Sequence, residues 1–343
     1  MNHLRGCSTA MLLACLAPAV LPAQEADDAS SRPSVVAPLA PRALLLDLAW
    51  AGPRAVAVGE RGIVLYSDDQ GRSWTQVQVP ASANLTAVYF VDGLHGWAVG
   101  HDEVVLRTED GGLTWERTRY NPETNRPLLD LWFGDAEHGL AVGAYGLVLS
   151  SADGGRSWTE VPFDPEPLGG KKQAYDPDDY DAEVDMGFDF HLNAVVPGPE
   201  SVLYLAAEAG RLFRSDDRGA TWRELPSPYD GSFYGIMPLD GDALLAYGLR
   251  GHVFRSGDGG QSWSQIETGT VALLNSAVRP SAGLIVIAGL TGVMLVSTDG
   301  GGSFAFTQQD DRKAFSSLLW AGDGEVIVSG EGGVRRLAVP GLR

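Results

Sequence analysis

The side chains in this sequence that could do chemistry are mostly carboxylates. Six aspartates recur at nearly equal spacing, and each is followed five residues later by an aromatic residue. Paired carboxylates carry out catalysis in many glycoside hydrolases, so a glycosidase is one hypothesis. The six pairs are Asp69 with Trp74, Asp110 with Trp115, Asp153 with Trp158, Asp217 with Trp222, Asp258 with Trp263, and Asp299 with Phe304.

A second group of carboxylates lies in an irregular segment at about 164–189, which holds nine acidic residues and two lysines. Its tract 176–185 could wrap a hard cation through oxygen ligands. The tract lacks the glycine and the terminal glutamate of an EF-hand loop, so we favour a charged loop without a metal. Tyr175 and Tyr180 interleave with the acids, and this mixture suits docking of a partner.

The elements that position these residues follow from an internal repeat. The motif S/T-x-D-x-G-x-S/T-W/F occurs six times, with its aromatic positions 41, 43, 64, 41 and 41 residues apart. The long interval is one period plus an insertion of about 23 residues, and a fixed period of this length indicates a repeat architecture. A second pattern, V-G-x-x-G-x-V-L, precedes each motif, and alternating apolar stretches precede that. Each unit is therefore expected to form four short strands.

A seventh unit, residues 315–337, supplies three strands and has no motif. Seven four-stranded units predict an all-β fold, a seven-bladed β-propeller over residues 44–343. We expect Ser34–Leu39, within a Pro-rich tether at 24–43, to add the missing outer strand to the last blade and so remove an open edge.

The motif itself has a structural explanation. Aspartate and Ser/Thr side chains bond backbone groups in a tight turn, glycine supplies positive φ, and the aromatic residue packs between sheets. Because every blade but the last repeats the motif, we expect the six aspartates to be structural and none to be catalytic.

The N-terminus predicts export. Residues 1–23 have the basic start, apolar run and small-residue end of a signal peptide. Cleavage there would leave an exported, periplasmic chain without cysteine, which excludes disulfides and thiolate zinc sites. The alternative is a lipoprotein anchored through Cys15.

Net charge limits the partners. There are 25 Lys and Arg residues against 44 Asp and Glu, for a formal charge of −19, so nucleic-acid binding is not expected. The histidines His101, His191 and His252 are dispersed over three repeats, and we predict neither a metal nor a cofactor.

The six motifs are Asp-box, or BNR, repeats. The fuller unit, which here reads H-G-W-A-V-G-x-x-x-x-V-L-R-T-x-D-G-G-x-T-W at residues 95–115, resembles that of the photosystem II stability/assembly factor family, and the resemblance extends over residues 44–337. It implies a secreted, non-enzymatic, seven-bladed propeller that holds a membrane protein or its assembly intermediate. In bacteria without photosynthesis, similar proteins are often associated with RND-type exporters.

The sequence favours a binding scaffold over a glycosidase. Residues 40–45 do not match the F/Y-R-I-P motif that opens the arginine set of sialidases, and no G-x-S-x-G, phosphate loop or H-E-x-x-H is present. A carboxylate pair remains open as the alternative. We expect a monomer.

Binding is predicted on the face that carries the G-x-x-G loops, opposite the Asp-boxes. The residue types in these loops differ from blade to blade while the framing glycines persist, as in binding loops on a repeated scaffold. Solvated turns are the alternative. The candidate residues there are Arg61, His101, Arg126, Tyr145 and Arg250, beside Tyr175 and Tyr180 of the insertion.

Overall fold

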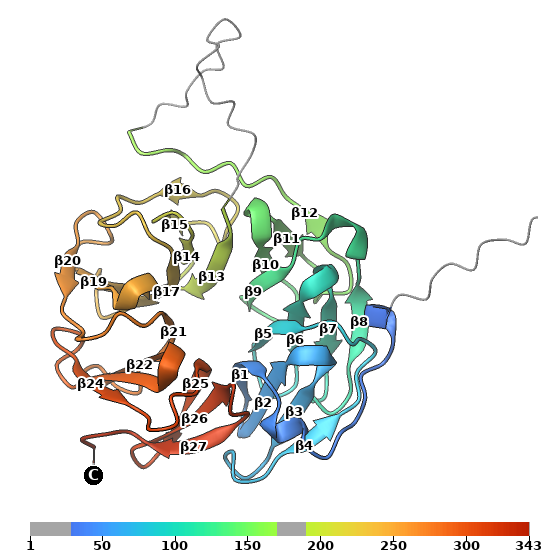
Figure 1. The fold of residues 1–343 in the computed structure, drawn as a ribbon. Helices are drawn as coiled ribbons and strands as arrows, with labels where there is room; N and C mark the ends of the chain where they lie inside the picture. The colour runs from blue at the N-terminus through green and yellow to red at the C-terminus, as the bar shows by residue number, and fades with distance from the viewer. Residues whose placement is uncertain (1–28, 170–189, 343) are drawn as a thin grey trace, which may run out of the picture.

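The computed structural model describes residues 29–169 and 190–342, which form seven antiparallel sheets arranged as a ring (Figure 1). In each blade, chain order runs from the inner strand outward, so neighbouring strands pair as sequential hairpins. The seven-bladed, all-β propeller predicted from the repeat is confirmed. No helix in these described ranges is long and apolar enough to span a membrane.

The first four blades follow the 42-residue period apart from the insertion. The first blade contains β1 (Leu45–Ala51), β2 (Arg54–Gly59), β3 (Val64–Ser67) and β4 (Thr75–Val77). The second contains β5 (Leu85–Phe90), β6 (Gly96–Gly100), β7 (Val105–Thr108) and β8 (Glu116–Arg119). The third contains β9 (Leu128–Phe133), β10 (Gly139–Gly143), β11 (Val148–Ser151) and β12 (Thr159–Glu160). The fourth contains β13 (Leu192–Pro197), β14 (Leu203–Ala207), β15 (Leu212–Ser215) and β16 (Arg223–Glu224).

The last three blades complete the ring. The fifth contains β17 (Phe233–Pro238), β18 (Leu244–Gly248), β19 (Val253–Ser256) and β20 (Ser264–Ile266). The sixth contains β21 (Leu274–Val278), β22 (Ile285–Gly289), β23 (Val293–Ser297) and β24 (Ala305–Gln308). The seventh contains β25 (Phe315–Gly322), β26 (Glu325–Gly330) and β27 (Arg335–Ala338).

Eight short 3-10 helices lie in the connections that the structure describes. They are η1 (Ala29–Ser31), η2 (Ala40–Arg42), η3 (Glu60–Gly62), η4 (His101–Glu103), η5 (Pro122–Thr124), η6 (Ala144–Gly146), η7 (Leu249–Gly251) and η8 (Leu290–Gly292).

The apolar core lies between the blades. The second strand of each four-stranded blade is buried, as at β6 and β10, apart from Arg54 at the start of β2, because it meets a neighbouring sheet on both faces. The indole of Trp97 on β6, for example, stacks on the ring of Phe133 on β9 of the next blade. Packing therefore joins each sheet to the next around the ring.

The Asp-box turns are hydrogen-bonded as closed units. In the first box, Asp69 Oδ1 accepts from Ser67 Oγ at 2.8 Å, and its Oδ2 accepts from Ser73 Oγ at 2.6 Å. The backbone N–H of Gly71 donates to Ser67 Oγ at 2.8 Å. The same contacts recur at Asp110, Asp153, Asp217, Asp258 and Asp299.

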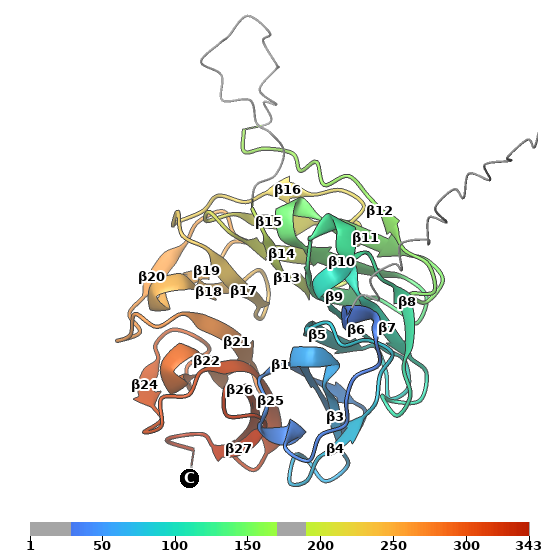
Figure 2. The same ribbon diagram turned by 45° about the vertical axis from the view of Figure 1, so that its right-hand side comes forward.

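The prediction that Ser34–Leu39 completes the last blade is wrong. The seventh sheet has three strands, and the N-terminal segment runs from the second blade across the first (Figure 2). Ser34 is fully buried beside β4, where its N–H donates to the carbonyl of Val79 at 2.9 Å and its Oγ accepts from the Val79 N–H at 3.0 Å. Pro38 and Pro41 have no N–H to donate to a neighbouring strand, and η2 turns the chain. Among the described residues, one backbone hydrogen bond therefore links this segment to the last blade, from the Val334 N–H to the Pro41 carbonyl.

Candidate functional site

The G-x-x-G loops share one backbone geometry on one face of the ring, the near face in Figure 1, where their short helices are drawn as coiled ribbons. The second loop residue is left-handed in six blades. In the first blade the framing glycine before it leaves no room for a side chain, since a Cβ at Gly59 would lie 2.3 Å from the Leu44 carbonyl oxygen. In the fourth blade Ala207 occupies this position. The left-handed residues, with φ between 53° and 59°, are Arg61, Asp102, Tyr145, Ala209, Arg250 and Thr291.

This geometry exposes the predicted binding residues but does not bring them together. Arg61, His101, Tyr145 and Arg250 are exposed, and they belong to the first, second, third and fifth blades. Arg61 lines a cavity of about 650 Å³ with Val35 and Leu39 of the N-terminal segment, and Arg250 lines another of about 430 Å³. The ring of Tyr145, which is 55% exposed, stands edge-on to His191 at 5.1 Å.

Arg126 is engaged in an ion-pair network beneath the same face. Its guanidinium bonds both oxygens of Glu160, at 2.9 and 2.8 Å, and lies 3.2 Å from Glu103. The Glu103 side chain is fully buried and also accepts from Arg119 and Thr124. Burial opposes ionisation of Glu103, but these hydrogen bonds outweigh it and hold its pKa below the ordinary value. Through these ion pairs Arg126 holds the segment that connects β8 to β9 in place.

The predicted residues Tyr175 and Tyr180, Cys15 and the signal segment 1–23 lie outside the described residues. Both flanks of the insertion are described. Glu166 pairs in parallel with Arg223 at the outer edge of the fourth blade, and the Phe190 carbonyl accepts from the N–H of Gly146 on the G-x-x-G face. Within the described ranges no three His, Cys, Asp or Glu side chains gather as metal ligands.

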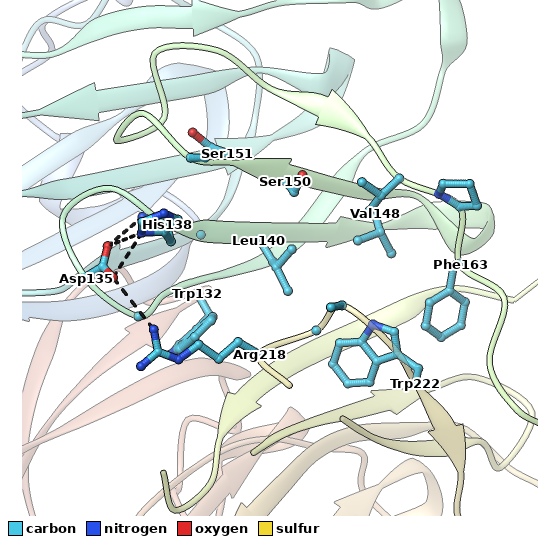
Figure 3. A pocket seen from close by; sticks show the side chains of 17 residues that line it. Trp132, Asp135, His138, Leu140, Val148, Ser150, Ser151, Phe163, Arg218 and Trp222 are labelled. Atoms are coloured by element: carbon cyan, nitrogen blue, oxygen red, sulfur yellow. Dashed lines mark hydrogen bonds and ion pairs between the residues drawn. The ribbon is translucent and has the colours of Figure 1, made fainter. Parts of the chain in front are cut away.

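Sequence reasoning missed an apolar cavity of about 510 Å³ between the third and fourth blades (Figure 3). Trp132, Leu140 and Val148 of the third blade form one wall, while Trp222 of the fourth blade's Asp-box and Phe163 close it. The cavity reaches the Asp-box face, where Asp135 joins His138 at 3.0 Å and Arg218 at 4.0 Å. Backbone N–H groups of Glu137 and His138 lower the pKa of Asp135, so its carboxylate is ionised at the rim.

Two small replacements open this cavity. Between the second and third blades, Trp97 Nε1 and Arg107 Nε both donate to the Gly154 carbonyl, at 2.9 and 2.6 Å, and close the gap. The paired positions one blade later are Leu140 and Ser150. Leu140 lies against Gly219 of the facing Asp-box loop but has no N–H to donate, and Ser150 is much shorter than the arginine. A break in the repeat was the available signal, because the residues before the other five boxes are Tyr66, Arg107, Arg214, Arg255 and Val296.

The glycosidase alternative gains no support from these cavities. Of the four most prominent cavities in the described parts of the chain, none is lined by more than one carboxylate. Asp47 and Asp130 do have raised pKa values, about 6 and about 7, because both are desolvated between inner strands. They accept backbone hydrogen bonds from Val88 and Val195 of the next blades, so they tie strands together.

The fold and the loops define a β-propeller of the Asp-box class that displays variable side chains on a rigid ring. Comparison with known proteins gives a more particular likeness. Residues 67–184 match the family model described as "Photosynthesis system II assembly factor YCF48". The resemblance to photosystem II assembly factors that the repeat units predict is confirmed.

The curated relatives match short stretches. The photosystem II assembly protein Ycf48 of Thermosynechococcus vestitus is 42% identical over 43 residues, 12% of either chain. The chloroplastic stability/assembly factor HCF136 of Oryza sativa subsp. japonica is 29% identical over 125 residues, 32% of this chain and 30% of the relative. The chain thus spans less than a third of the length of these relatives.

Solved structures match over most of the chain at low identity. A structure titled "YCF48 bound to D1 peptide" has a TM-score of 0.65 at 16% identity and covers 87% of this chain and 94% of that one. YCF48 from Cyanidioschyzon merolae gives 0.66 at 16%, covering 87% and 96%. The WD40 propeller of Doa1 gives 0.62 at 13%, covering 90% and 95%. These likenesses show the propeller fold.

Proposed function

We propose that this chain is a non-enzymatic binding scaffold that assists the assembly or stability of a membrane-protein complex. One observation carries the proposal: the same left-handed loop recurs in six blades on one face, and the residue that it presents varies among arginine, aspartate, tyrosine, alanine and threonine. A rigid frame with variable loops suits recognition of a large surface, because little ordering entropy is lost on binding. The likeness to photosystem II assembly factors supports the same role.

The proposed partner is a membrane protein or its assembly intermediate. One structural relative is, by its title, bound to a D1 peptide. For a chain exported to the periplasm of a bacterium without photosynthesis, an RND-type exporter is the partner we propose. Tyr175 and Tyr180 of the acidic insertion are proposed to join the contact, because the Phe190 end of that insertion returns beside Tyr145 on the G-x-x-G face.

Affinity capture from detergent-solubilised membranes of the source cell tests the proposal. The triple variant Arg61→Glu, Tyr145→Ala, Arg250→Glu alters three exposed loop residues on the G-x-x-G face. We expect it to melt as the wild type does and to lose the membrane protein that the wild type retains.

Arg218→Glu is the matched control on the opposite face, where Arg218 is 58% exposed. It should retain the partner. Loss of the partner with Arg218→Glu alone would place the contact at the apolar cavity instead. Capture of no membrane protein by the wild-type chain, together with turnover of a glycoside panel, would reject the scaffold proposal.

A further inference from the structure

The last blade leaves one strand edge unpaired. Within residues 29–169 and 190–342, six sheets have four strands and the seventh ends at β27, which pairs only with β26. Hydrogen-bonded and non-hydrogen-bonded residue pairs alternate along two antiparallel strands. Because the Val339 N–H donates to the Gly324 carbonyl, Leu337 and Arg335 also direct their N–H and C=O groups toward β26. Arg336 and Ala338 therefore turn their N–H and C=O groups outward.

The N-terminal segment covers only the start of this edge. The outward N–H of Val334 donates to the Pro41 carbonyl at 3.0 Å, and the chain then turns away along the first blade. Its earlier residues are held elsewhere, since Arg117 of β8 donates to the Ser31 carbonyl at 3.0 Å. The edge beyond Val334 is left open, beside the Asp-box loop of the first blade (Figure 1).

A groove of about 900 Å³ runs along the open edge. Val334 and Leu337 of the last blade and Trp74 of the first supply its apolar surface. Among the described residues no acidic side chain lines it, in a chain whose formal charge is −19. Its basic lining residues are Arg42, Arg72, Lys313, Arg335 and Arg336.

Within the described residues, two of these five cations form ion pairs, and the charge of Lys313 also acts on Asp311. Arg335 pairs with Asp311 at 2.7 Å and Arg336 with Glu325 at 2.5 Å. The other three lie on three separate elements and are exposed: Arg42 on η2, Arg72 in the first Asp-box and Lys313 before β25. The groove thus combines unpaired backbone donors and acceptors, an apolar floor and an excess of cations.

We infer that β27 binds an extended acidic peptide of a partner protein as the missing fourth strand of the last blade. Backbone hydrogen bonds at Arg336 and Ala338 would give affinity, as in other cases of strand addition. Apolar side chains on one face of the peptide would meet Trp74 and Leu337, and carboxylates would meet Arg42, Arg72 and Lys313. Gly332 of the last blade's G-x-x-G loop lines one end of the groove, but the groove is not lined by Arg61, Tyr145 or Arg250, the residues altered to test the proposed function. Either test can therefore fail while the other stands.

Fluorescence anisotropy measures binding of a labelled probe, Gly-Glu-Val-Asp-Val-Glu-Val-amide, to the full chain. We expect saturable binding that weakens as salt rises. The counterpart with Lys at every acidic position should bind at least about tenfold more weakly. The same sequence with alternate backbone nitrogens methylated should also lose affinity, because it cannot form the ladder.

Ala338→Pro tests the backbone contact. Proline removes an outward N–H and blocks the edge, while the inward bonds of Leu337 and Val339 remain. Ala338→Val keeps the N–H and is the control. We expect at least about tenfold weaker probe binding for the proline variant alone, with unchanged melting.

Arg72→Glu tests the charge, and Arg156→Glu is its matched control. Both arginines occupy the same Asp-box position and donate to their box aspartate's carbonyl at 3.0 Å, but Arg156 lies in the third blade. Only Arg72→Glu should weaken binding. Equal binding by the acidic and lysine probes, or by Ala338→Pro and wild type, would overturn the inference. A wild-type dimer that Ala338→Pro converts to a monomer would overturn it too, by making a second copy the occupant.

Discussion

The carboxylate of Asp130 accepts a 2.8 Å hydrogen bond from the backbone N–H of Val195, which joins the inner strand of the third blade to that of the fourth. Asp47 makes the same contact with Val88 between the first and second blades, at 2.9 Å. At other junctions a side-chain amide or hydroxyl makes the hydrogen bond between blades. Asn193, for example, donates to the Phe233 carbonyl. Two junctions of the ring therefore depend on a desolvated carboxyl group.

This arrangement predicts that stability falls as pH rises from acid toward neutral. Burial raises the pKa of Asp130 from 3.8 to about 7, so between these values the folded chain holds a proton that the unfolded chain has released. By linkage, stability falls as pH rises through this window. Asp130→Asn keeps an acceptor for Val195 and cannot ionise, so its urea midpoint should fall less than that of the wild type between pH 5 and pH 8. Asp323→Asn, at an exposed turn, is the control and should leave the wild-type slope unchanged.

The Asp-box carboxylates predict the opposite dependence at acid pH. The side-chain hydroxyl and the N–H of Ser157 are the main causes that lower the pKa of Asp153 to about 2. The stability that comes from this ionised group is present above about pH 4 and is lost as pH falls toward 2. Ser157→Ala should therefore lower the urea midpoint at pH 5 and have little effect at pH 2. An equal loss at both pH values would contradict the assignment.

The box aromatic residue predicts a large packing effect. Trp115 is 8% exposed, stands edge-on to Phe90 at 6.1 Å and donates from Nε1 to the Gly112 carbonyl at 3.0 Å. Trp115→Ala should lower the free energy of unfolding by about 3–5 kcal/mol. Leu113→Ala, in the same turn but 41% exposed, is the control and should change it little. Chemical denaturation distinguishes the two.

The N-terminal segment should stabilise the first blade and not the last. The Oγ of Ser34 accepts from the Val79 N–H, and Gln76 and Gln78 donate to the carbonyls of Val35 and Ser34. Ser34→Ala should therefore raise hydrogen exchange at Val79 and leave the β26–β27 amides unchanged. Faster exchange in β27 would instead support closure through the last blade.

Much of this fold could be predicted because it repeats. The spacing of the boxes located six blades, the strand pattern of residues 315–337 located the seventh, and the glycines located the left-handed loops. The path of the N-terminal segment past the last blade could not be predicted by counting strands. It depends on Pro38 and Pro41, which have no backbone N–H to donate to a neighbouring strand. Each exposed residue of the G-x-x-G loops could be predicted individually. The ring places these residues on separate blades, so Arg61 and Arg250 line different cavities.

The cavity between the third and fourth blades shows the reverse case, in which a departure from the repeat decides the structure. Ser150 stands where Arg107 closes the preceding gap, and the difference is visible only when the blades are aligned on their boxes. Ser150→Val should fill part of the cavity with apolar volume against Leu140 and Trp222, and β-branching suits its strand. We expect a gain of about 0.5–2 kcal/mol, as for other filled cavities. Ser150→Ala adds no volume and should be close to neutral.

The reciprocal change tests the same idea one blade earlier. Arg107→Ser removes the group that bonds the Gly154 carbonyl, together with its ion pairs to Glu109 and Glu116. It should open a matching cavity and lower the free energy of unfolding by about 1–3 kcal/mol. An apolar fluorescent probe such as anilinonaphthalene sulfonate should then bind at two sites in Arg107→Ser and at fewer in Ser150→Val than in the wild type. If neither variant changes stability or probe binding, the residue before the Asp-box does not determine whether a cavity forms between blades. Another contact must then keep the third and fourth blades apart.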